Sequence, residues 1–353
     1  MGKVFAVAML IIGTIVGAGF VSGREIVAFF GANASPWIAV LCAALIFGLS
    51  VLFLFIGSRL NSKNVSEVNL KLAGRFHIVT DAFLLVNNLI ILAGMLAAMD
   101  SLGASIIPFT PLFSIVFGIL SVVVVCFGIK AVIRCNKIAS PIMIVALAFV
   151  GIFTVVSVSG GEAGTAVGNI GMVFVYVCMN MMLASTVITT LGRMKMKSII
   201  ASSAIAAGLM GGLIFILMMA LNSWGTITGD MPTLEMARAI HPAVYWIMVI
   251  VVAVSIFTTM IIALSGLVSW FTPLLGSKIF AAITLLIAAF ILSNLGFANV
   301  VRFLYPVIGV FGIIYVVLGI IYAGRTLPVF GFLSKRRKGK EKVKEIKESK
   351  SSG

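Results

Sequence analysis

A succession of ten apolar runs, each long enough to cross a lipid bilayer, constrains this chain more than any other feature. Lipid offers the backbone no hydrogen-bond partners, so an isolated apolar run must be helical there. We therefore predict an all-α integral membrane protein with ten transmembrane helices, at about residues 4–29, 36–59, 77–101, 110–129, 138–158, 166–190, 197–221, 243–270, 278–294 and 300–323.

The composition excludes the common soluble classes. The chain is 61% apolar and 10% charged, whereas soluble domains have about 45–50% apolar and about 25% charged residues. The spans carry no paired carboxylates, no Ser–His pair and no cluster with metal-ligand spacing, so we expect neither an enzyme nor a bound cofactor. The four cysteines form no C-x-x-C motif and are expected to be free thiols.

The basic residues predict the orientation. If the N-terminus is inside, 22 Lys and Arg lie on the inner side and three on the outer side. Basic loops favour the cytoplasm, so both termini are expected there. We expect residues 1–324 to form the transmembrane domain and residues 325–353 a disordered basic tail. Such a tail is attracted to anionic lipids; no nucleic acid and no obligate protein partner is expected.

The first span contains an unusual density of glycine. Gly13, Gly17, Gly19 and Gly23 fall within 11 residues, and each weakens a helix by about 1 kcal/mol relative to alanine. A broken helix frees backbone groups that a bound ion or solute can satisfy. The alternative is that Gly13 and Gly17 allow a close helix contact.

Polar residues near the middle of other spans are further candidates. Asn180 lies in the sixth span, close to Tyr176, and Asn87 and Asn88 lie in the third. A buried amide in a membrane is costly unless it is bonded, so it marks either a functional site or a hydrogen bond between helices. We expect one of the two asparagines of the third span to face the protein interior.

The eighth span carries three hydroxyls on one helix face. Ser255, Thr258 and Thr259 have the spacing i, i+3 and i+4. Each hydroxyl can bond to its own backbone, but three together form a polar stripe.

These stretches together resemble the amino acid–polyamine–organocation superfamily, whose members have the LeuT-type fold. The string Gly13 to Gly19 resembles the unwound first helix of that superfamily, and the stripe Ser255, Thr258 and Thr259 resembles its sodium-coordinating eighth helix. The run from Lys130 to Pro141 resembles the loop into helix five of neurotransmitter:sodium symporters. Gly17 to Glu25 and Tyr176 to Asn180 are most similar to the YkvI-like bacterial membrane proteins.

The resemblance implies a five-plus-five inverted repeat, with repeat one at about 4–158 and repeat two at about 166–323. It also implies discontinuous helices one and six, although helix six lacks the glycines often found at its break. The implied function is secondary active transport in the bacterial plasma membrane: sodium-coupled symport of a small polar solute, such as an amino acid, by alternating access. A proton-coupled transporter of the same fold, and a channel or sensor, remain the alternatives.

The candidate residues form three groups. The backbone of a half-helix favours a carboxylate, so the solute is expected to contact Gly17, Ala18, Gly19, Asn87, Tyr176 and Asn180. Sodium prefers oxygen ligands, which are expected from Gly13, Val16, Ser255, Thr258 and Thr259. An outer gate is expected from Arg24, Glu25 and Arg302, for instance through an ion pair between Glu25 and Arg302. A lysine on span five would instead favour protons, but Lys137 lies near the inner end.

Overall fold

The computed structural model describes residues 2–31, 34–62, 64–106, 111–157, 169–225 and 231–326, and these are built from helices without a strand. The predicted tail therefore lies outside the described residues from position 327 onward. The first span consists of α1 (Gly2–Ile15), α2 (Ala18–Val21) and α3 (Arg24–Phe30). The tenth consists of α14 (Phe297–Asn299), a π-helical turn η2 (Val300–Leu304) and α15 (Tyr305–Thr326).

Each of the other eight predicted spans corresponds to one helix. These are α4 (Ile38–Leu60), α6 (His77–Ala104), α7 (Leu112–Cys126), α8 (Ile129–Ser157), α9 (Ile170–Ile188), α10 (Met196–Trp224), α12 (Pro242–Leu275) and α13 (Lys278–Ser293). Within the described residues, seven helical segments are long and apolar enough to cross a membrane. The three shorter apolar helices, α1, α7 and α13, occupy the first, fourth and ninth predicted spans.

The predicted break in helix six is wrong for the described part of that span. The α9 helix is continuous from Ile170 to Ile188. The physical reason is its composition, because no glycine or proline occurs between Val173 and Ile188. Nothing in this stretch weakens the helix as the four glycines weaken the first span.

The helices are buried to different extents, which locates the centre of the bundle. Every α1 residue from Val7 to Ile15 is buried, and α1 packs against α8, α9, α10 and α12. Outer helices keep large apolar side chains exposed, among them Ile119 on α7, Val145 on α8 and Ile287 on α13. An apolar exterior around a buried central helix is the arrangement expected of a multi-pass membrane protein.

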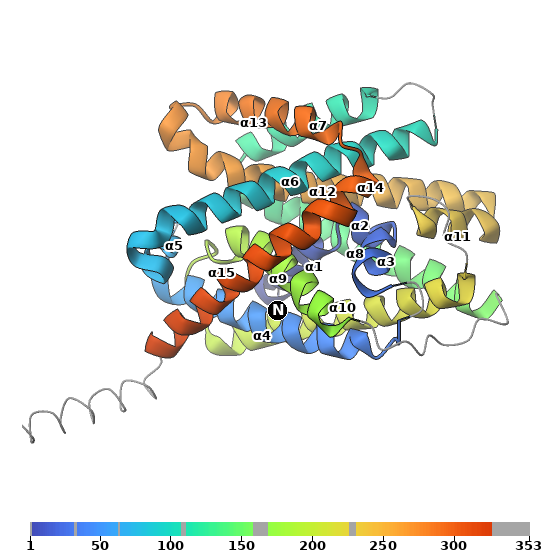
Figure 1. Ribbon diagram of the computed structural model, residues 1–353, viewed down its shortest axis with the longest axis horizontal. Helices are drawn as coiled ribbons and strands as arrows, with labels where there is room; N and C mark the ends of the chain where they lie inside the picture. Colours follow the sequence, from blue (N-terminus) through green and yellow to red (C-terminus); the bar gives the residue numbers. More distant parts are fainter. Residues whose placement is uncertain are drawn as a thin grey trace, which may run out of the picture.

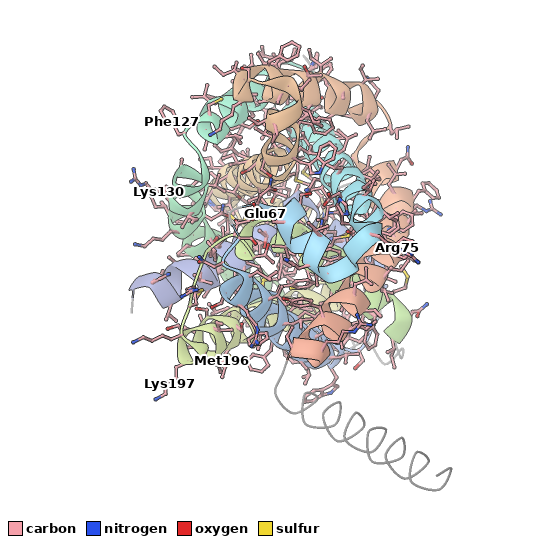
Figure 2. The ribbon with its side chains drawn as sticks, turned by 90° about the vertical axis from the view of Figure 1, so that its left-hand side faces the viewer. Glu67, Arg75, Phe127, Lys130, Met196 and Lys197 are labelled. Carbon is pink, nitrogen blue, oxygen red and sulfur yellow. The ribbon has the colours of Figure 1, made fainter. Side chains whose placement is uncertain are left out.

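Two short helices mark the opposite ends of the bundle. The long helices run roughly from one end to the other, with α5 (Val65–Ala73) at one end and α11 (Pro232–Ile240) at the other (Figure 1). Figure 2 looks onto the end with α5, where Arg75, Lys130 and Lys197 point outward. These three residues belong to three segments that the charge count predicts to lie inside.

Asp81, which we expected to be a simple boundary charge, joins α5 to α6. Its buried carboxylate accepts hydrogen bonds from the Ser66 hydroxyl at 2.7 Å and from the Asn69 amide. The Tyr315 hydroxyl of α15 donates to Asn69 Oδ1 at 3.0 Å. The network therefore connects three elements at this end of the bundle.

Candidate functional site

The first span is broken twice, at the positions of its glycines. The Gly17 amide donates to the Ile15 carbonyl at 2.8 Å, so the Gly13 carbonyl loses the partner that an unbroken helix would supply. The second break falls at Gly23, whose φ of 79° is left-handed and favours glycine. Thr233 of α11 binds this second break, because its hydroxyl donates to the Val21 carbonyl at 2.6 Å.

The polar stripe of α12 lies against the first break. The Ser255 hydroxyl donates to the Val16 carbonyl at 2.7 Å, and the Thr258 hydroxyl donates to the Ser255 carbonyl at 3.0 Å. Thr259 Oγ1 is buried without a hydrogen-bond partner, and a Cβ added at Gly17 would lie 3.1 Å from it. The structure therefore brings Val16 and Gly17 of the first break against Ser255 and Thr259 of α12.

The α8 helix contributes a side chain that the sequence analysis missed. Asn136 is buried, its Oδ1 has no hydrogen-bond partner, and a Cβ added at Gly13 would overlap this atom. The Ser140 hydroxyl donates to the Met9 carbonyl at 2.9 Å. Gly13 thus does serve a close helix contact as well as lying beside the break. Lys137 is exposed, so the lysine considered for proton coupling is not part of this site.

A small cavity opens beside the first break. Its volume is about 10 Å³, roughly the room needed for one water molecule. Five polar residues from four spans line it: Thr14 and Glu25 from the first span, Asn180 from α9, Thr259 from α12 and Tyr305 from the tenth span. Apolar side chains complete the lining, namely Ile15, Ile91, Met95, Met179 and Leu183.

The predicted gate pair is not formed, because Glu25 lies on this cavity. Its side chain is 3% exposed, and Oε2 is buried without a hydrogen-bond partner. The carboxylate packs directly against Gly19, where an added Cβ would overlap Oε1. Arg302 is exposed, and its guanidinium lies 5.2 Å from the Phe303 ring centroid. The Glu25–Arg302 example is wrong because α3 begins directly after Gly23 and Glu25 lies on the cavity. A gate that involves Arg24 stays a prediction.

The predicted solute-binding residues are only partly brought together. Asn180 lines the cavity, with its amide nitrogen donating to the Tyr176 carbonyl at 3.0 Å. Tyr176 is buried beside Phe29 and Phe30 at ring-centroid distances of 5.2 Å each, and its hydroxyl has no hydrogen-bond partner. Asn87 is buried with neither amide atom bonded, and it is not among the residues lining this cavity.

The backbone of the first break is less available to bind a solute carboxylate than we expected. In this structure the Gly17 amide is bonded to Ile15, and the Glu25 carboxylate packs against Gly19. A second carboxylate beside Gly19 would be repelled by the first. The predicted cradle for a solute carboxylate, formed by Gly17, Ala18 and Gly19, is therefore occupied at two of its three positions.

Tyr305 is a cavity residue that the sequence analysis did not identify. Its buried hydroxyl has no partner, and a Cβ added at Gly94 of α6 would lie 3.0 Å from it. The preceding π-helical turn η2 places the tyrosine there, and such turns occur frequently at functional sites. Nothing in the spacing of the tenth span predicted a π turn, so the sequence offered no clear signal.

Two further cavities lie along α9 and α12. The first is lined by Asn88, Thr186 and Gly266 among others. Asn87 and Asn88 are both buried, so the expectation that one of them faces the interior holds for both. The second has a volume of about 520 Å³, within the range of about 300–1,000 Å³ typical of small-molecule sites. Its hydroxyl-bearing residues are Thr186, Thr190, Ser265, Ser269 and Thr272. All three cavities are lined by α9 and α12; α6 lines the two small ones, and the largest also reaches Lys278 at the start of α13.

Comparison with known proteins identifies both a sequence relative and the fold. No family model matches the chain. It is 26% identical over 337 residues to the uncharacterized membrane protein YkvI of Bacillus subtilis (strain 168), covering 87% of this chain and 92% of YkvI.

Three solved structures are similar in fold. The first is MhsT in complex with L-phenylalanine, with a TM-score of 0.70 and 18% identity over 90% of this chain and 88% of MhsT. The second is Mhp1, a nucleobase-cation-symport-1 family transporter with bromovinylhydantoin bound, with a TM-score of 0.63 and 15% identity over 86% of this chain and 74% of Mhp1. The third is a Na⁺-coupled sialic acid symporter, with a TM-score of 0.62 and 12% identity over 88% of this chain and 75% of the symporter. This chain is therefore a YkvI-like multi-pass membrane protein with the LeuT-type fold.

Proposed function

We propose that this protein is a secondary transporter that moves a small polar organic solute, such as an amino acid, together with sodium by alternating access. The observation that carries the proposal is the meeting of the first break with the α12 stripe. There the Val16 carbonyl accepts from Ser255 while Thr259 Oγ1 has no partner. An ion bound to both helices would join them, and its release would let them separate.

The ligand set suits sodium. The candidate ligands are the carbonyls of Gly13, Val16 and Ser255 and the hydroxyls of Thr258 and Thr259, all neutral oxygens. Hard cations take oxygen ligands, and a neutral set binds a monovalent ion weakly enough for it to leave. Asn136 adds a neutral amide from α8 where a lysine would favour proton coupling. One structural neighbour is a Na⁺-coupled symporter, which supports the same assignment.

The solute site is proposed at the small cavity, and the path to the cytoplasm at the two cavities that follow it. The volume of about 10 Å³ beside the break is too small for an amino acid, so a solute must displace side chains as it enters. Tyr176 packed against Phe29 and Phe30 covers one side of this region. We assign this aromatic group to the closed outer gate, in place of the predicted pair of Glu25 and Arg302.

We also propose the orientation and repeat organisation that the sequence predicts. Both termini are assigned to the cytoplasm of a bacterial cell, and residues 4–158 and 166–323 to inverted repeats. The end with Arg75, Lys130 and Lys197 is then the inner end, and the largest cavity is assigned to the same side. The basic tail is assigned to anionic lipids at that surface.

A thermal-shift measurement on the purified protein tests the coupling ion and the solute together. Sodium, compared with choline at equal ionic strength, should raise the unfolding temperature because an ion that binds the native state stabilises it. Amino acids are then added with and without sodium, and the solute should bind more tightly with sodium present. Stabilisation by the solute that does not depend on sodium and increases as the pH falls would contradict sodium coupling and favour proton coupling.

A further inference from the structure

Glu25 places a carboxyl group in the centre of the bundle. Its side chain is 3% exposed, and Oε2 has no hydrogen-bond partner. None of the described residues lining the cavity is basic. A buried carboxylate without a compensating cation is costly, and an ionisable residue within a membrane span marks a functional site by default.

The groups around Glu25 are oxygens that can accept hydrogen bonds. Tyr305 OH and Thr259 Oγ1 line the same cavity, and both are buried without partners. A protonated amine has three donors and no acceptor, so it can satisfy several of these oxygens while it neutralises the carboxylate.

Building on the proposed function, we propose that the transported solute carries a protonated amine and that Glu25 is its counter-charge. The apolar remainder of the solute would contact Ile91, Met95 and Met179, which line the same cavity. A carboxylate on the solute is not required, because Glu25 already packs against Gly19, where the first break would otherwise receive one. The solute class therefore extends from amino acids to amines that lack a carboxylate.

The test is a thermal-shift and binding panel built from matched compounds on the purified wild-type protein. Each set contains an amino acid, its decarboxylated amine, its deaminated acid and the isosteric alcohol, for example phenylalanine, phenethylamine, hydrocinnamate and phenethyl alcohol. A second set uses leucine, isoamylamine, isocaproate and isoamyl alcohol. We expect the amine of at least one set to bind in sodium, with its acid and alcohol failing to bind. This part of the test uses the wild-type protein alone, so it does not depend on whether a variant folds.

Three variants assign the binding to the carboxylate. Glu25→Gln should weaken amine binding by about thirtyfold or more, because a buried charge pair loses one partner, and Glu25→Asp should restore part of the affinity. Glu67→Gln is the matched control, since Glu67 is an exposed glutamate on α5. It should bind amines like the wild type.

Several outcomes would overturn the inference. One is that the acids or alcohols bind with the same affinity as the amines. Another is that Glu25→Gln leaves the amine affinity unchanged. A third is that Glu25→Gln abolishes stabilisation by sodium when no amine is present. If sodium stabilises the wild type but no amine binds, the proposed coupling ion stands and the amine assignment fails. If amines bind through Glu25 without any sodium effect, the amine assignment stands and sodium coupling fails.

Discussion

The first and sixth spans begin the two halves that we propose for the bundle, yet the first is broken twice and the described part of the sixth is continuous. The first span has glycines at 13, 17, 19 and 23, and the helix stops at Ile15 and again at Val21. The α9 helix is continuous from Ile170 to Ile188. The difference indicates that the local density of glycine decides where a span unwinds.

The largest effect is expected from filling the space beside the first break. A Cβ at Gly13 would overlap Asn136 Oδ1, so Gly13→Ala should lower the free energy of unfolding by about 1–3 kcal/mol through overpacking. Gly208 on α10 has nothing within 4 Å of an added Cβ, and Gly208→Ala should be neutral or stabilising. Size-exclusion chromatography after heating measures both variants. Equal stability of the two would contradict the tight contact with Asn136.

The next effect concerns the ion. The double variant Thr258→Ala, Thr259→Ala should weaken sodium stabilisation by about tenfold or more, which corresponds to about 1.4 kcal/mol. Thr154→Ala serves as the control, because the Thr154 hydroxyl bonds to Val150 of its own helix, at 2.8 Å. Sodium titrations followed by thermal shift compare the three proteins. An unchanged sodium midpoint in the double variant would remove the α12 stripe from the ion site.

A smaller effect is expected from the single hydrogen bond that joins α12 to the break. Ser255→Ala removes the bond from the Ser255 hydroxyl to the Val16 carbonyl, and such bonds between membrane helices contribute about 0.6 kcal/mol on average. The buried Ser121 hydroxyl bonds within its own helix to Gly118, so Ser121→Ala is the matched control. Thermal unfolding without sodium should show Ser255→Ala as the less stable variant; the reverse order would contradict a joining role.

The smallest change in stability is expected from the continuous helix. Asn180 donates to the Tyr176 carbonyl of its own helix, so Asn180→Ala should change the free energy of unfolding by no more than about 0.5 kcal/mol. Solute affinity should nevertheless fall, because Asn180 lines the cavity beside Glu25. Binding measured alongside unfolding separates the two effects. Unchanged affinity would assign Asn180 to structure alone.

The sequence predicted the features that depend on local composition. Apolar run length located the helices, and glycine density located the break between Ile15 and Ala18. The spacing of Ser255, Thr258 and Thr259 placed three hydroxyls on one face, and the fold brings that face to Val16.

The features that depend on tertiary direction were not predictable. Glu25 follows the second break, and its inward orientation depends on how α3 leaves Gly23. Asn87 and Asn88 are both buried, and which of them lines a cavity depends on the rotation of α6 about its axis. Tyr305 reaches the cavity only because the π turn η2 precedes it. A rotation of a helix by one residue position leaves the sequence pattern almost unchanged, but it decides which side chain faces the site.

Transport by proteoliposomes tests the central claim most directly, with the solute taken from the binding panel. An inward sodium gradient should drive accumulation of that solute above its external concentration in the wild type, and the variant Thr258→Ala, Thr259→Ala should not accumulate it. Preloaded solute should also speed uptake, as expected of a carrier. Downhill flux without accumulation or trans-stimulation, or accumulation driven only by a pH gradient, would contradict sodium-coupled transport at the broken first helix.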